Sequence, residues 1–255
     1  HEGIPTPRRE AEWKPAPAGA GRQAAPSRPA APGKLTDALL TLLGHPNIAS
    51  KHWIIRQYDH EVKGGTAIKP LGGPLGRGPM DAAVMRPVQG SAKGLAISCG
   101  LQTGMGDPAI GGDPYLMTLA AIDECVRNLV CSGADPDRIA ILDNFCWPSC
   151  KKPENLATLV RAAEACYDGA IAYRTPFVSG KDSLNNQFTT KDGRTIEIPP
   201  TLLITGISVV GDVTRCVTMD AKRPGNLLVV VGPASPAMGG THSPPMLGLP
   251  AGASG

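Results

Sequence analysis

The sequence predicts a mixed α and β fold, because segments with helical spacing alternate with short apolar segments of strand length. The clearest helical pattern covers residues 115–132, and the clearest strand covers residues 201–210. Of the 255 residues, 42% are hydrophobic and 18% are charged, which suits one or two globular domains.

The first element expected after the N-terminal region is a helix over residues 35–43. Its apolar residues recur at helical spacing: Leu35, Ala38, Leu39, Leu42 and Leu43. Residues 53–62 mix β-forming residues with charge, and residues 64–79 are rich in Gly and Pro, which indicates a loop. Short strands are expected at residues 82–85 and 95–98.

The helix of residues 115–132 has signals at both ends. Asp113 is a suitable N-cap, Pro114 suits the first helical position, and Gly133 suits the C-terminal stop. We expect its apolar face to consist of Leu119, Ile122, Val126, Leu129 and Val130.

A strand at residues 139–142 follows, and then a second helix over residues 156–171. The pattern assigns this helix an apolar face of Leu156, Leu159, Val160, Ala163, Tyr167, Ala170 and Ile171. Residues 201–210 and 227–231 are apolar enough to be buried strands.

Composition argues against nucleic-acid and membrane partners. The net charge is only +3, no long Lys/Arg run is present, and aromatic residues make up 4% of the chain. The longest run of strong hydrophobes, residues 227–231, is too short to span a bilayer, and no secretion leader is visible. The seven cysteines form no CxxC pair, which indicates reduced, buried thiols and a cytoplasmic location.

Composition also indicates the domain organisation. Residues 15–34 consist almost wholly of Pro, Ala and Gly, so we expect a linker there. Residues 1–14 are too few to fold alone and are expected to be the end of a preceding domain. Residues 35–220 are expected to form the main domain, and residues 221–255 the incomplete start of another.

Glu124 and Asn128 are the first candidate ligands. They lie four residues apart on the expected helix and therefore share one of its faces. A carboxylate and an amide oxygen are ligands that suit Mg²⁺. The alternative is that Glu124 only pairs with Arg127 or faces solvent, and the helix alone favours this alternative.

Two aspartates are expected at strand ends. Asp81 follows a Gly/Pro-rich loop and precedes a strand, and Asp143 follows the strand of residues 139–142 directly. Strand ends are where α/β folds often place binding residues. The alternatives are a turn cap for Asp81 and an Asx turn for Asp143.

Residues 176–186, PFVSGKDSLNN, bring several ligand types together. Gly180 allows close approach of a ligand to the backbone, Asp182 can hold a metal ion, and Ser183 can donate a hydrogen bond. Lys181 is followed by Asp, so this is no Walker A loop. A polar hairpin loop is the alternative.

Taken together in order, five segments resemble one family, the synthetase subunit of phosphoribosylformylglycinamidine synthase, in its second half. The segments are IASKHWIIRQYDHEV (48–62), DAAVMRP (81–87), GGDPYLMTLAAIDECVRNLVCSGADPDRIAILDNFCW (111–147), PFVSGKDSLNN (176–186) and IPPTLLITGISVVGDVTRCVTMDAK (198–222). The resemblance runs from about residue 35 to residue 242.

The resemblance implies an α+β fold of the aminoimidazole-ribonucleotide-synthetase-like (AIR-synthetase-like) type, with an N-terminal α+β domain followed here by the truncated start of a C-terminal α/β domain. The implied reaction is the ATP-dependent conversion of formylglycinamide ribonucleotide to formylglycinamidine ribonucleotide. It uses ammonia that a glutamine amidotransferase releases. The implied partner is the synthetase's own first half, whose sheet pairs with this one.

The resemblance also implies roles for single residues. Asp81, Glu124, Asn128 and Asp182 match Mg²⁺ ligands, and Asp143, Gly180 and Ser183 match nucleotide-contacting positions. Short-form relatives often have a metal-ligating asparagine where this chain has Lys181, so the resemblance assigns that role to Asp182 here, as in the long forms. No catalytic residue is implied, and His60 has no assigned role. The isolated fragment is expected to be inactive and poorly folded, because its sheet expects a partner and its C-terminal domain is unfinished.

Three roles remain open at this point. The site can turn over ATP, or it can hold ATP or ADP as a structural part of a half that supports an active first half. The third alternative is another ATP-dependent synthetase or kinase of the same superfamily.

Overall fold

The computed structural model describes residues 8–15, 35–57, 61–108 and 111–232. The expected linker beyond residue 15, His60 and the chain from residue 233 onward lie outside the described residues.

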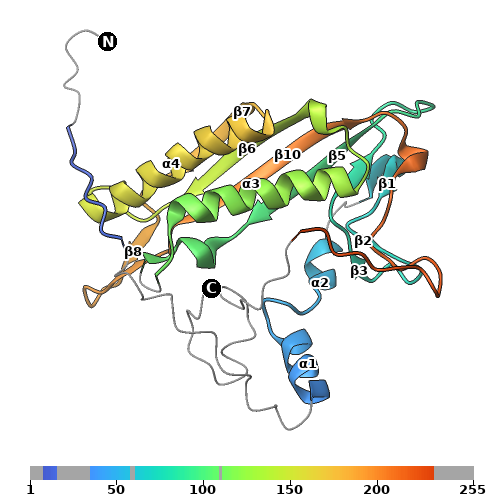
Figure 1. The fold of residues 1–255 in the computed structure, drawn as a ribbon. Helices are drawn as coiled ribbons and strands as arrows, with labels where there is room; N and C mark the ends of the chain where they lie inside the picture. The colour runs from blue at the N-terminus through green and yellow to red at the C-terminus, as the bar shows by residue number, and fades with distance from the viewer. Residues whose placement is uncertain (1–7, 16–34, 58–60, 109–110, 233–255) are drawn as a thin grey trace.

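A six-stranded sheet forms the centre of the fold, with strand order β1-β4-β5-β10-β6-β7 (Figure 1). Its strands are β1 (Thr66–Ile68), β4 (Ala83–Met85), β5 (Gly94–Leu101), β10 (Thr201–Val210), β6 (Ile139–Cys146) and β7 (Phe177–Ser183). All neighbours are antiparallel except β6 and β7, which are joined by a crossover through helix α4 (Pro153–Tyr173). Helices α3 (Pro114–Cys131) and α4 cover one face of the sheet (Figure 1). The expected α+β class is confirmed.

Helix α3 forms as the sequence predicts. The Asp113 side chain accepts a hydrogen bond from the backbone N–H of Tyr115 at 2.9 Å, and Pro114 occupies the first helical position. Gly133 follows the helix with a φ of +99°, a left-handed conformation that favours glycine. The expected apolar face is largely buried, but Val130 is 42% exposed.

Helix α4 also forms, but the apolar face predicted for it is only partly right: Leu156 and Leu159 pack against the core, and the rest of that face does not. Val160, Tyr167 and Ile171 are exposed, and the buried face carries small residues instead: Ala157, Thr158, Ala162, Ala165, Cys166 and Gly169. The two helices pack closely, and a Cβ on Gly169 would lie 2.6 Å from Cδ1 of Ile122. Close packing therefore selects small side chains on α4 rather than large apolar ones.

The remaining strand predictions have mixed outcomes. β4, β5, β6 and β10 are all present, and β5 and β6 are longer than expected. The strand expected at residues 227–231 is wrong, since these residues have no regular structure and are 77% to 98% exposed. No described strand pairs with them, and a strand gains little stability without a ladder partner or a core.

The smaller elements surround the sheet. Helix α1 (Leu35–Gly44) is confirmed, and α2 (His52–Ile55) lies within the segment that mixes β-formers with charge. The expected loop of residues 64–79 contains β1 and a short hairpin, β2 (Leu71–Gly72) and β3 (Gly78–Pro79). A second hairpin consists of β8 (Gln187–Thr189) and β9 (Thr195–Glu197). Among these described segments, no helix combines the length and apolar character needed to cross a membrane.

The closest contact in the core joins α3 to β5. A Cβ on Gly100 would lie 2.0 Å from the backbone oxygen of Ala121, and one on Gly206 would lie 2.7 Å from Sγ of Cys125. Ser98 Oγ donates to the backbone oxygen of Cys125 at 2.8 Å across the same contact. Glycines on β5 and β10 thus let the helix lie directly on the sheet.

Among the described residues, no helix covers the opposite face of the sheet (Figure 1). Met85, Ile97 and Leu101 are 45%, 39% and 48% exposed, and side chains of β10 on this face are half-buried. An apolar sheet face of this kind is typical of an interaction surface.

We predict that Gly100→Ala destabilises the fold by roughly 3 kcal/mol, because the new methyl group meets backbone that cannot move without shifting α3. Urea unfolding followed by circular dichroism measures the change. Gly104→Ala is the matched control, since a Cβ there meets nothing within 4 Å. Equal stability of the two variants would contradict the packing described for α3.

Candidate nucleotide and metal site

An open cavity of about 600 Å³ lies between α4 and the strands β6 and β7. Its lining combines polar and apolar side chains: Asp143, Phe145, Leu159, Ala163, Phe177, Ser179, Gly180, Asp182 and Leu184. Three of the residues singled out from the sequence, Asp143, Gly180 and Asp182, therefore share one cavity. Neither the Asx turn nor the polar hairpin loop is present, since these residues lie within strands β6 and β7.

Gly180 and Asp143 face each other on neighbouring strands. They are register partners in the parallel β6–β7 pair, and a Cβ on Gly180 would lie 2.5 Å from Oδ1 of Asp143. The carboxylate of Asp143 also accepts a hydrogen bond from the backbone N–H of Lys181. The absence of a side chain at Gly180 is thus what leaves room for the carboxylate at this wall of the cavity.

The two carboxylates in the cavity repel each other. Burial raises the pKa of the Asp143 carboxyl above its ordinary value, and the negative charge of Asp182 raises it further. Carboxylates repel phosphate groups and accept hydrogen bonds from hydroxyl and amino groups. The cavity is therefore suited to an uncharged, polar part of a ligand or to a cation.

Ser183 is not in this cavity. The lining includes Gly180 and Asp182 but neither Lys181 nor Ser183. The ammonium group of Lys181 contacts Oγ of Ser183 instead. The sequence grouped Ser183 with Asp143 and Gly180, but Ser183 does not line the cavity that contains them.

Glu124 and Asn128 hold the end of β5. Glu124 Oε2 accepts hydrogen bonds from the backbone N–H of Leu101 at 2.8 Å and from Nε2 of Gln102 at 2.9 Å. Asn128 Nδ2 donates to the backbone oxygen of Cys99 at 3.2 Å. The β4–β5 pairing stops at Ile97, so these side chains bind the part of β5 that β4 leaves open.

The exposed-face alternative for Glu124 does not hold. Arg127 pairs instead with Asp123, at 2.5 Å between Nη2 and Oδ2. Asn128 binds Cys99 through its amide nitrogen, so its amide oxygen points away from Cys99. Glu124 binds Leu101 and Gln102 through Oε2 alone, so its other oxygen, Oε1, takes no part in those two bonds. These two oxygens suit a hard cation.

Asp81 lies near the same end of the sheet, beside the end of β5. It precedes β4 by two residues, and Ala83 of β4 is the register partner of Ile97. Continuing this antiparallel register places Asp81 opposite Cys99, whose backbone oxygen binds Asn128. Glu124 and Asn128 thus form the ligand set at this end of the sheet, and Asp81 lies just before the neighbouring strand β4.

Asp182 does not join that set. β10 and β6 lie between β5 and β7, so Asp182 is three strand spacings, or roughly 14 Å, from the end of β5. Within the described parts of the chain, no three His, Cys, Asp or Glu side chains gather in a way that could hold a metal ion. The expected set of four is divided by the width of the sheet, which sequence spacing does not reveal.

Sequence reasoning missed the apolar walls of the cavity and the role of Gln102. Phe145 and Phe177 lie on β6 and β7, and Leu159 and Ala163 lie on α4. The period-2 alternation around Asp143 was a signal for Phe145, since both then face the same side. No sequence signal indicated that Gln102 binds Glu124.

Comparisons with known proteins agree with this fold. The family described as AIR synthase related protein, N-terminal domain, matches residues 79–210, about half of the chain. The PurL subunit of phosphoribosylformylglycinamidine synthase from Gloeobacter violaceus is 35% identical over 225 residues, which cover 84% of this chain and 27% of that protein. The PurL subunit from Deinococcus radiodurans is 37% identical over 201 residues, covering 79% of this chain and 25% of that protein.

A solved structure is similar as well. The PurLQS structure from Thermotoga maritima matches with a TM-score of 0.51 and 27% identity, covering 66% of this chain and 25% of that one. The chain thus spans about a quarter of the length of the relatives it matches. The resemblance found in the sequence is confirmed: this chain belongs to the family of AIR synthase related proteins, carries its N-terminal domain, and is similar to the PurL subunits.

Proposed function

We propose that this chain is part of an ATP-dependent carbon–nitrogen ligase that converts formylglycinamide ribonucleotide to formylglycinamidine ribonucleotide in purine biosynthesis. The similarity to two PurL subunits over most of the chain supports this reaction. The observation in the structure that carries the proposal is the ligand set of Glu124 and Asn128 at the open end of β5. Such a set serves a reaction that must neutralise polyphosphate charge.

Each part of the proposed site has its own role. Asp81, Glu124 and Asn128 would hold Mg²⁺, which supplies positive charge to the phosphates of ATP or ADP when it is bound. Gly180 and Asp143 would contact the ribose or base, since a carboxylate accepts hydrogen bonds from hydroxyl and amino groups. Asp182 supports the cavity's negative charge and is left out of the metal set because β10 and β6 intervene.

The proposed partners follow from one surface and from the family. The apolar sheet face around Ile97 and Leu101 would pack on the corresponding face of the synthetase's first half. A glutamine amidotransferase would supply the ammonia.

The seven cysteines are all unpaired, which supports a cytoplasmic location, although Cys99 and Cys131 are exposed rather than buried.

The test of the reaction is ATP hydrolysis by the intact protein. We expect hydrolysis to require both formylglycinamide ribonucleotide and either ammonia or glutamine with the amidotransferase. Hydrolysis that proceeds at the same rate without the ribonucleotide would contradict the proposed reaction and favour another synthetase or kinase.

Gly180→Ala is expected to weaken nucleotide binding at least tenfold, because the methyl group would overlap the Asp143 carboxylate and displace it from the cavity wall. Isothermal titration with ATP measures the affinity. Gly211→Ala, where a Cβ meets nothing within 4 Å, is the control.

The Gly180→Ala variant also distinguishes a nucleotide that is turned over at this site from one that has only a structural role. If the nucleotide is turned over here, the rate per folded molecule collapses in Gly180→Ala while the melting temperature changes little. A lower melting temperature with an unchanged rate per folded molecule would support the structural alternative.

Glu124→Gln is expected to raise the Mg²⁺ concentration needed for half-maximal nucleotide binding by about tenfold or more, because it removes a charged ligand and keeps an acceptor for Leu101. Titration of nucleotide binding with Mg²⁺ measures this shift. Glu164→Gln, on the exposed side of α4, should leave the Mg²⁺ dependence unchanged. An unchanged dependence in Glu124→Gln would rule out this metal site.

Asp182→Asn is expected to stabilise the ligand-free protein at neutral pH by about 0.5 kcal/mol, because it removes a charge that repels Asp143 in a partly screened site. The pKa of Asp143 is raised in the folded state, so its ionised carboxylate destabilises the folded protein at neutral pH. This destabilisation is lost as pH falls through the raised pKa and the carboxylate takes up a proton. The stabilisation should therefore vanish in acid. Urea unfolding at neutral and acidic pH measures it, and a gain that persists in acid would contradict the repulsion.

A further inference from the structure

Residues 8–15, called the strap below, lie in an extended conformation beside the N-terminal end of α4 (Figure 1, dark blue). Arg9 Nη1 donates to the backbone oxygen of Cys150 at 3.3 Å. The backbone N–H of Glu12 donates to the backbone oxygen of Pro153 at 3.1 Å. Every residue of the strap is exposed except Trp13, which is half-buried. Trp13 is therefore the main anchor of the strap.

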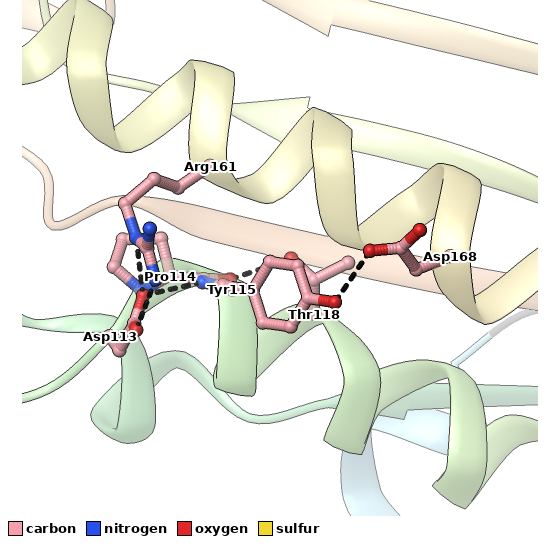
Figure 2. A network of polar contacts seen from close by, with 6 residues as sticks. All are labelled: Asp113, Pro114, Tyr115, Thr118, Arg161 and Asp168. Carbon is pink, nitrogen blue, oxygen red and sulfur yellow. Dashed lines mark hydrogen bonds and ion pairs between the residues drawn. The ribbon is translucent and has the colours of Figure 1, made fainter.

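Trp13 packs on the guanidinium group of Arg161. The guanidinium carbon of Arg161 lies 4.6 Å from the centre of a Trp13 ring and 5.6 Å from that of Tyr115. The same guanidinium binds Asp113 through two bonds, Nε to Oδ1 at 2.8 Å and Nη2 to Oδ2 at 2.5 Å (Figure 2). One side chain of α4 thus connects the strap to the N-cap of α3.

A second contact joins the two helices further along. Tyr115 Oη donates to Oδ2 of Asp168 at 2.6 Å (Figure 2). This bond lies entirely between α3 and α4 and does not involve the strap. Loss of the strap would therefore loosen the N-terminal half of α4 first.

Helix α4 separates the strap from the cavity. Leu159 and Ala163 line the cavity, and each is two residues from Arg161. Two residues correspond to about 200° of helical rotation, so Arg161 points away from the side that faces the cavity. A displacement of this part of α4 would therefore change the width of the cavity.

We propose that the strap is a clamp: Trp13, stacked on Arg161, fixes α4 against α3 and so sets the width of the cavity that contains Asp143 and Gly180. Trp13 and Arg161 are positioning residues, since neither lines the cavity. The proposal rests on the proposed nucleotide role only for its effect on ligand affinity. Its effect on α4 can be measured without any ligand.

Two buried cysteines report on the two helices separately. Cys166 lies on the buried face of α4, and burial raises the pKa of its thiol to about 12. Cys125 lies on the buried face of α3, and burial raises its pKa to about 11. Both thiols stay unreactive until their own helix moves, whereas Cys131 is exposed and serves as the reference.

The experiment is alkylation of the intact, ligand-free protein with N-ethylmaleimide, followed by mass spectrometry of each cysteine peptide. In Trp13→Ala we expect the rate at Cys166 to rise about two- to thirtyfold, the factor that loss of a cation–π contact implies. The rate at Cys125 should stay unchanged. Trp13→Phe should restore most of the protection, because it keeps an aromatic ring on Arg161.

Trp53→Ala is the matched control, since Trp53 is 66% exposed on α2. An unchanged rate at Cys166 in Trp13→Ala would overturn the clamp, and so would equal increases at Cys166 and Cys125, which indicate general loss of stability. Titration with ATP and Mg²⁺ should show weaker binding in Trp13→Ala. Absence of binding in the unmodified protein would contradict the proposed function and leave the labelling result to decide the clamp.

Discussion

The fold depends on how closely helix α3 approaches strand β5. At Gly100 the backbone of the helix occupies the space that any side chain would need. This contact places Glu124 and Asn128 beside the last residues of β5, where β4 no longer pairs. Backbone groups there would otherwise lack partners, so two side chains complete the strand and present their remaining oxygens in one place. Packing and ligand geometry are thus consequences of the same glycine.

The parallel strands β6 and β7, at the other edge of the sheet, are positioned by a different element, helix α4. The crossover through α4 places β7 beside β6 with Asp143 opposite Gly180. α4 packs through small residues, and an open cavity lies between it and the strands β6 and β7. The acidic residues therefore lie at two places: Glu124 at the end of β5, and Asp143 and Asp182 in the cavity beside β6 and β7. A ligand with a charged part and an uncharged polar part suits such a division.

Local signals predicted much of this fold. The caps Asp113 and Pro114 fixed the start of α3, and the apolar run of residues 201–210 predicted β10. Failures came where distant contacts decide the outcome. Residues 227–231 have strand composition but no neighbouring strand, and Tyr167 is large and apolar yet lies outside because α4 packs through small residues. Asp182 was expected to act with residues that strand order places elsewhere, and Ser183 with residues whose cavity it does not line, which sequence spacing cannot express.

The most direct test is a crystal structure of the intact protein with Mn²⁺ and a non-hydrolysable ATP analogue, using anomalous scattering to locate the metal. The account predicts an anomalous peak within ligand distance of Glu124 and Asn128, with no contribution from Asp182. A peak bound between Asp143 and Asp182, with none near Glu124, would contradict it.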